Sequence, residues 1–173
     1  ALQLSYSYRI RRPVYNDLSP YVTLSDNRNF FSGNPDLNPE FSDVIELGHI
    51  KYFDKGSFAS TLYYRHTDDK IERIRLVDKD GFSNTQPYNL IREDAYGLEF
   101  ISSLKAAKWW KLDWSLNVFG ATVDGSNIDE GFTAETFSWF TRATNRFTLP
   151  QNTMLQLRAN FEAPQNIAQG KRK

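Results

Sequence analysis

Apolar and polar side chains alternate along most of the chain, and the spacing of an amphipathic helix is almost absent. Around residue 98, for example, Tyr96, Leu98 and Phe100 alternate with Gly97 and Glu99. Successive side chains of a β-strand point to opposite faces, so this pattern predicts strands with one apolar and one polar face. Two of the predicted strands, 43–53 and 57–66, carry apolar residues at both parities. Seven strands are expected in all, at residues 2–10, 43–53, 57–66, 95–104, 110–118, 137–149 and 155–161.

The connections between these strands are alternately short and long. The short ones lie at residues 54–57, 105–108 and 150–152, and the long polar ones at 11–42, 68–93 and 124–135. In an antiparallel meander, strict alternation places all short connections on one edge of the sheet. Outer-membrane barrels sort their connections in this way, with short periplasmic turns and long extracellular loops.

Aromatic residues are frequent, at 15% of the chain, and they gather at two levels along the predicted strands. Trp110 and Phe119 are nine residues apart, which is roughly 30 Å of strand at about 3.3 Å per residue. With a tilt of about 40°, that length becomes roughly 23 Å, close to the ~25 Å apolar band between the aromatic girdles of a barrel. The candidate girdle residues are Tyr52, Phe53, Trp109, Trp110 and Phe147 beside the short turns, and Tyr96, Phe119 and Trp139 at the other level.

The polar faces of the predicted strands hold several charged residues. Arginine facing lipid costs about 2–4 kcal/mol near the bilayer midplane, whereas arginine facing an aqueous lumen costs little. A soluble β-sandwich would place the same residues in solvent equally well, so these charges do not separate the two folds. Within a barrel, the candidate lumen-facing residues are Glu99, Arg142, Arg146 and Arg158.

Composition narrows the possible functions. Lysine plus arginine equals aspartate plus glutamate, at 21 each, and nucleic-acid binding would favour a basic excess. The chain has no cysteine, so thiol catalysis, disulfides and cysteine-ligated metals are excluded. His49 and His66 lie on different predicted strands and lack metal-ligand spacing. With no glycine-rich phosphate loop and no Gly-x-Ser-x-Gly elbow, we expect neither an enzyme nor a cofactor.

Three polar segments have an alternative interpretation. Residues 78–81 and 124–130 are acidic and could bind calcium, but the first is typical of a turn and the second lacks the spacing of an EF-hand loop. Arg9, Arg11 and Arg12 cluster where the first strand enters a long loop. They could contact an anionic ligand or a lipopolysaccharide phosphate, or they could form a solvated rim.

One motif is specific enough to indicate a family. Arg12-Pro13 is followed by GNPDLNPE at residues 33–40, which includes Gly33, Asn34, Pro35, Leu37, Pro39 and Glu40. With this motif, residues 5–48 resemble the C-terminal barrel region of TonB-dependent outer-membrane receptors, in the outer membrane protein β-barrel family of Bacteroidota-type bacteria. Segments 94–99, 108–110 and 163–171 are similar to later parts of that family. The prolines are expected to hold the chain extended up to a strand that begins at about Asp43.

The resemblance implies an all-β, up-and-down meander of about seven strands within a larger transmembrane barrel in the outer membrane. Residues 1–173 are then expected to form one partial barrel domain, without a plug domain, a signal peptide or a closing strand. The implied partners are the lipid bilayer, the rest of the barrel and its plug, an inner-membrane energy-coupling protein, and a small ligand such as a siderophore, glycan or peptide. Two alternatives remain open, a soluble β-sandwich that binds carbohydrate and an outer-membrane barrel without a transport role.

Overall fold

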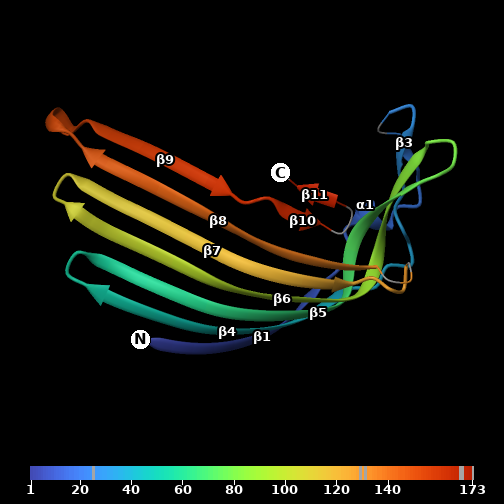
Figure 1. Ribbon diagram of the computed structural model, residues 1–173, viewed down its shortest axis with the longest axis horizontal. Coiled ribbons are helices and arrows are strands. Elements are labelled where there is room, and N and C mark those ends of the chain that lie inside the picture. The colour runs from blue at the N-terminus through green and yellow to red at the C-terminus, as the bar shows by residue number, and fades with distance from the viewer. Residues whose placement is uncertain (25, 129, 131, 168–169, 173) are drawn as a thin grey trace.

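The computed structural model describes residues 1–24, 26–128, 130, 132–167 and 170–172. Its main feature is a nine-stranded sheet in which seven long strands follow one another in an antiparallel meander (Figure 1). Neighbours along the chain are therefore neighbours in the sheet, as the alternating sequence pattern predicts. The strands of this meander are β1 (Leu2–Arg11), β4 (Glu40–Phe53), β5 (Gly56–Val77), β6 (Ser83–Ala107), β7 (Trp110–Asp124), β8 (Thr133–Thr148) and β9 (Met154–Glu162).

The short connections all lie at one edge of the sheet, on the left in Figure 1, and this prediction is confirmed. They comprise residues 54–55, residues 108–109 and a single 3-10 turn, η1 (Pro150–Asn152). Backbone hydrogen bonds join neighbouring turns. The N–H of Lys105 donates to the carbonyl of Lys55 at 2.7 Å, and the N–H of Thr148 donates to the carbonyl of Trp109 at 2.8 Å. We call this side of the sheet the short-turn edge.

The prediction of a long loop at residues 68–93 is wrong. Strands β5 and β6 continue through most of it and stay paired as far as Val77 and Ser83, so that the connection spans only residues 78–82. The hydrophobic alternation stops near residue 68 because the environment changes there, not because the strands end. Ile71, Ile74 and Leu90 are buried in this extension by the segments that pack against it. We call the extended part of β5 and β6 the rim hairpin.

The long connection after β1 is also partly ordered. It contains α1 (Tyr15–Leu18), β2 (Thr23–Leu24) and β3 (Asn29–Phe31), and β3 pairs in parallel with the start of β6. The connection from β7 to β8 spans residues 125–132, close to the prediction. Near the C-terminus, β10 (Gln165–Ile167) and β11 (Gly170–Arg172) form a separate two-stranded sheet. Within the described ranges, the structure contains no helix of sufficient length and apolar character to span a membrane.

The main sheet has two chemically different faces. The apolar face carries rows such as Leu62, Leu98, Val118 and Trp139, which are opposite one another on β5, β6, β7 and β8. Leu4 on β1 remains 73% exposed on this face, and no second sheet among the described residues covers it. A β-sandwich would bury such a face against another sheet, so the sandwich alternative is wrong.

Candidate functional site

The polar face of the sheet contains a hollow of about 460 Å³ near the base of the rim hairpin. Its wall comes from six consecutive strands of the meander, β1 and β4 to β8, and includes Glu72 in the part of β5 that belongs to the rim hairpin. Four carboxylates and two guanidinium groups line it, contributed by Glu46, Glu72, Glu93, Glu99, Arg9 and Arg65. A hollow with fixed charges of both signs can orient a polar ligand or dock a polar protein segment.

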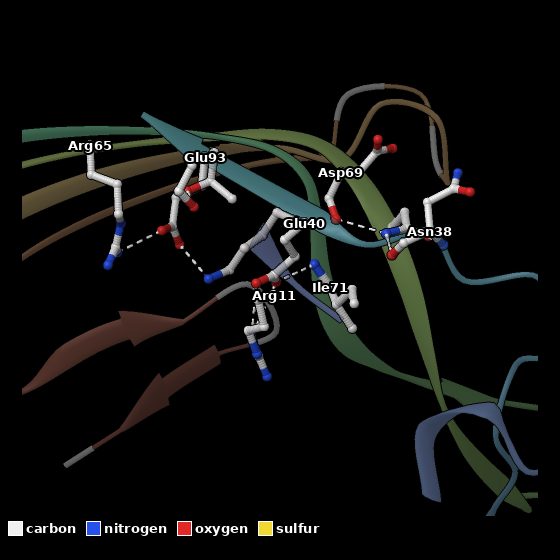
Figure 2. Close-up of polar contacts among 11 residues, drawn as sticks. Arg11, Asn38, Glu40, Arg65, Asp69, Ile71 and Glu93 are labelled. Carbon is white, nitrogen blue, oxygen red and sulfur yellow. Dashed lines mark hydrogen bonds and ion pairs between the residues drawn. The ribbon is translucent and has the colours of Figure 1, made fainter. Parts of the chain in front are cut away.

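Glu93 is the best-compensated charge in this hollow. Its side chain is 11% exposed, and it forms ion pairs with Arg65 at 2.8 Å and with Lys70 at 3.3 Å (Figure 2). A buried carboxylate is costly unless partners replace its water shell, and two cations do so here. The arrangement fixes the side chains of neighbouring strands relative to each other.

A backbone irregularity at Asp69 brings Lys70 into this cluster. Asp69 has a positive φ of 54°, and neither Asp69 nor the residue opposite it takes part in the ladder between β5 and β6. Before this point the even-numbered residues of β5 lie on the apolar face, whereas Lys70 and Glu72 beyond it lie on the polar face with Glu93. The carbonyl of Asp69 accepts a hydrogen bond from the Asn89 side chain at 2.7 Å, which holds the irregularity in place.

Glu72 is the carboxylate of the cluster whose charge is least favoured by its surroundings. Burial raises the pKa of its carboxyl group, and nearby Glu93 and Glu40 act in the same direction, while Lys70 and Arg11 oppose them. Because Glu72 lies on the rim hairpin, beyond the apolar band, this shift belongs to the polar part of the molecule.

Glu40, the last residue of the family motif, is nearly fully buried at 4% exposure. Its carboxylate pairs with Arg11 at 3.1 Å and accepts the backbone N–H of Ile71 at 2.7 Å (Figure 2). Glu40 is also the first residue of β4, directly after Pro39. The strand therefore begins three residues earlier than the predicted start at Asp43.

The glycine and first asparagine of the motif make close backbone contacts. The N–H of Gly33 donates to the carbonyl of Ser19 at 2.9 Å, and a Cβ at this position would lie 2.3 Å from the same oxygen. The N–H of Asn34 donates to the carbonyl of Asp17 at 2.6 Å, and its side chain donates to the carbonyl of Pro87 on β6 at 3.2 Å. Only glycine fits such a close approach of two backbones.

The second asparagine completes the contact with the rim hairpin. The N–H of Asn38 donates to the Asn89 side chain at 2.8 Å, and that side chain donates back to the carbonyl of Asn38 at 3.1 Å. Leu37, directly before Asn38, is buried. The motif therefore attaches the long connection to the rim hairpin through hydrogen bonds, in addition to the stiffening by Pro35 and Pro39. We call Gly33, Asn34, Leu37, Asn38 and Glu40 the rim clasp.

Sequence reasoning missed the partners of the rim clasp. Asn89 and Pro87 lie in the segment predicted as a loop, so neither was a candidate. Asp17, on α1, is 5% exposed and pairs with Arg73 of β5 at 2.7 Å, while the Arg73 guanidinium lies 4.9 Å above the Phe31 ring. The burial of Asp17 is visible only in the structure, so the sequence carries no local signal that this aspartate needs a distant partner.

The predicted lumen-facing residues all lie on the polar face. Glu99 is opposite Asn117, Arg142 is opposite Ser115, and Arg158 is opposite Thr144, so the ladder pairings place them on one side of the sheet. Arg146 lies on the same side and pairs with Asp113 at 2.7 Å. Of the four, only Glu99 lines the hollow, because the arginines lie nearer the short-turn edge or on the outer strands.

Most of the candidate girdle aromatics lie on the apolar face or in the short turns. Trp109, Trp110 and Phe147 stack together, with ring centroids 6.0 to 6.3 Å apart. Phe53 is opposite Gly56 at the same edge, and the apolar face also carries Tyr96 and Trp139.

Two of the girdle assignments are wrong. Phe119 is opposite Gly97 and Ser138 on the polar face, where it lines the hollow, and Tyr52 is opposite Ser57 on that face. The error has a simple cause. Trp110 and Phe119 are an odd number of residues apart, so a strand necessarily points them to opposite faces.

With the correct parity, the apolar band runs from the row of Trp110 to the row of Gly120. The ten residue steps between these rows span about 33 Å, or about 25 Å at a tilt of about 40°, which matches the apolar band of a transmembrane barrel. Tyr96, beside Gly120, ends the band, and the next row is polar. Asp94 lies in that next row, on the same face of the sheet as Tyr64, and its carboxylate accepts a hydrogen bond from the Tyr64 hydroxyl at 2.6 Å.

The remaining candidate sites have structural contacts. His66 contacts Asp94 at 2.7 Å, and the described residues contain no group of three acidic or histidine side chains that could hold a metal. The Asp78 carboxylate accepts the N–H groups of Asp80 and Phe82, as in a turn. In segment 124–130, Asp129 lies outside the described residues.

The arginines near the end of β1 do not act as one cluster. Arg11 pairs with Glu40, whereas Arg9 lines the hollow and donates to the Ser7 hydroxyl at 3.2 Å. Arg12 follows the strand and is exposed.

Comparisons with known proteins agree with this architecture. The model of the outer membrane protein beta-barrel family matches residues 1–173. No curated protein sequence matches the chain. Among solved structures, the chain is similar to the siderophore receptor PirA from Pseudomonas aeruginosa, with a TM-score of 0.57 and 16% identity. The match covers 98% of this chain and 37% of the receptor chain, so this chain spans little more than a third of that length. The chain belongs to the outer membrane protein beta-barrel family, and its apolar face is that of an outer-membrane protein.

Proposed function

We propose that this chain forms part of the barrel wall of a TonB-dependent receptor that takes up a scarce ligand across the outer membrane. The observation that carries the proposal is the charged hollow on the polar face, directly below a rim hairpin held by the rim clasp. A barrel that only stabilises the membrane has no need for an ordered rim above a recess lined by Arg65, Glu93 and Glu99.

In this proposal, the polar face lines the lumen and the rim hairpin faces the outside of the cell. β1 and β9 each pair on one side only among the described residues, and further barrel strands would complete their ladders. The ligand enters past the rim hairpin and contacts the lumen wall at the hollow. A plug coupled to an inner-membrane energy source would release it to the periplasm.

The test is an uptake assay in cells that lack the gene and are complemented with the full-length protein. Mass spectrometry of the medium follows the depletion of ferric siderophores, cobalamin, oligosaccharides and peptides, with and without the energy-coupling protein. We expect one class to be depleted only when both proteins are present, and more slowly with Glu99→Gln. Lys51→Gln, on the apolar face near the short-turn edge, is the control and should behave as wild type. Depletion that is independent of the gene for every class would contradict transport.

A further inference from the structure

A second recess, of about 690 Å³, lies where the rim hairpin leaves the apolar face. It is formed by β1, β4, β5, β6 and the connection from β7 to β8, and it is separate from the hollow on the polar face. Its aromatic wall is Tyr8 and Phe41, whose rings stack with centroids 6.0 Å apart and an angle of 20°. We call this recess the outer groove.

Tyr8 provides an open aromatic surface in the outer groove. It is 60% exposed although it stacks on Phe41. The ladder pairings place Tyr8 opposite Asp43, and Tyr6 opposite Ile45, all on the apolar face. The outer groove is thus a continuation of the face that contacts lipid, and not of the face with Glu99 and Glu93.

The polar wall of the outer groove is rich in hydrogen-bond acceptors. Asp68 is 58% exposed, and Figure 2 shows the Asp69 carboxylate pointing away from Arg65 and Glu93. No hydrogen bond or ion pair of the Asp69 carboxylate occurs within the described part of the chain. Asn127 uses its amide N–H to bind the carbonyl of Asn89 at 2.8 Å, which leaves its side-chain oxygen as an acceptor.

These groups define the chemistry of a ligand. An open aromatic face packs against the C–H side of a flat, saturated ring, and carboxylate and amide oxygens accept hydrogen bonds from hydroxyl or amino groups. No lysine or arginine lines the outer groove, while Asp68 and Asp69 do, so a phosphate would be repelled. A sugar ring with free hydroxyl or amino groups satisfies both walls.

The position of the outer groove indicates where such a sugar comes from. Phe41 and Asp68 are opposite each other, two rows beyond the row of Tyr64 at the end of the apolar band. Two rows span about 13 Å of strand, or about 10 Å of height at the tilt used above. The outer groove therefore lies just beyond the roughly 5–8 Å headgroup region on that side of the hydrocarbon core, at a height that the sugars of a glycolipid reach. A molecule anchored in the same leaflet therefore reaches the outer groove directly.

We propose that the outer groove binds a sugar of a membrane glycolipid, with Tyr8 as the stacking surface and Asp68, Asp69 and Asn127 as hydrogen-bond acceptors. This site is independent of transport, because it lies on the outside of the barrel wall. Its occupant would hold the receptor within the glycolipid layer next to the rim hairpin.

The test uses the full-length receptor in vesicles of phosphatidylethanolamine with or without lipopolysaccharide. Bound glycolipid is measured by mass spectrometry after purification. We expect Tyr8→Ala to reduce retention about tenfold, within the range of one aromatic contact. Asp69→Asn keeps the side-chain shape and tolerates the positive φ, and it should reduce retention several-fold. Should Tyr8→Ala fail to fold, as judged by gel mobility before and after heating, Asp69→Asn still provides the test.

Two control variants isolate the site. Tyr52→Ala removes an aromatic ring that is 73% exposed at the opposite edge, and Asp36→Asn removes an exposed charge from the family motif, so both should retain glycolipid like wild type. Equal retention by wild type and both groove variants would overturn the proposal. Equal binding of the free oligosaccharide and the intact glycolipid would contradict the claim that the ligand comes from the membrane. Retention of phosphatidylethanolamine instead of the glycolipid would contradict the claim that the ligand is a sugar.

Discussion

The Glu40 carboxylate accepts the backbone N–H of Ile71 at 2.7 Å and so joins the start of β4 to the rim hairpin. Both residues are buried, at 4% and 7% exposure. Water therefore cannot replace this hydrogen bond. Its acceptor, Glu40, is the last residue of the most specific motif in the sequence. The motif thus acts as an anchor for the connection that covers one side of the rim hairpin.

Glu40→Ala should destabilise the rim by about 1–3 kcal/mol, because the N–H of Ile71 loses its acceptor while remaining buried. Arg11, whose side chain is 60% exposed, returns to solvent and adds little. The measurement is hydrogen exchange of the Ile71 amide in the full-length protein in lipid vesicles. Asp36→Asn is the control, and unchanged Ile71 exchange in Glu40→Ala would show that the carboxylate does not anchor the rim.

Gly33→Ala and Gly48→Ala form a matched pair. A Cβ at Gly33 would lie 2.3 Å from the carbonyl oxygen of Ser19, whereas a Cβ at Gly48 has no neighbour closer than 3.9 Å. The first substitution should therefore cost roughly 1–3 kcal/mol, as overpacking does elsewhere, and the second much less. Urea unfolding in lipid vesicles gives both values, and equal midpoints for the two variants would contradict the close approach at Gly33.

Glu72 predicts a pH-dependent contribution to stability. Because burial raises the pKa of its carboxyl group, the folded protein holds this proton more tightly than the unfolded chain. Stability is therefore highest below the unfolded pKa near 4.5, falls as the pH rises through the folded pKa, and is constant above it. Glu72→Gln should be more stable than wild type at neutral pH and equal to it at about pH 4. The free energy of unfolding of both proteins is measured as a function of pH, and the difference between the two curves separates Glu72 from Glu40 and Glu93. A Glu72→Gln variant that is less stable than wild type at neutral pH would contradict the unfavourable burial of this carboxylate.

Asn89→Ala should release both the clasp and the irregularity at Asp69. The Asn89 side chain contacts the N–H and carbonyl of Asn38 and the carbonyl of Asp69. Its loss should increase hydrogen exchange at Asn38 and expose the rim to protease. The control is Asn16→Ala, which lies in the long connection between β1 and β4 that also contains Asn38. Protease resistance equal to wild type in Asn89→Ala would show that the clasp holds without this side chain.

The hydrophobic pattern predicts the part of the sheet in which one face is uniformly apolar and the other uniformly polar. Where one face meets lipid and the other a polar space, as around Leu98 and Glu99, period two predicts the strand, its faces and its neighbours. At the rim hairpin this condition no longer holds, and the strands continue although the pattern stops. Ile71, for example, is buried there and donates its N–H to Glu40 of the distant clasp, a contact that no local pattern can encode.

The girdle errors and the missed partners have different origins. Phe119 is an odd number of residues from Trp110, so counting parity along the strand corrects its assignment. Tyr52 and Phe53 are adjacent, so parity shows that one of them is on the polar face, but the strand has apolar residues at both parities and does not show which. The pairing of Asp17 with Arg73 joins residues 56 positions apart and depends on the path of a long connection. Such contacts follow only from the three-dimensional structure.

The central claim is that the apolar face contacts lipid and the polar face lines an aqueous lumen. Spin labels placed singly at residues 96–100 of β6, in the full-length protein in lipid vesicles, test it most directly. Accessibility to oxygen should peak at residues 96, 98 and 100, and accessibility to a water-soluble nickel complex should peak at 97 and 99. The two profiles are predicted to alternate out of phase, and profiles in phase along β6 would contradict the claim.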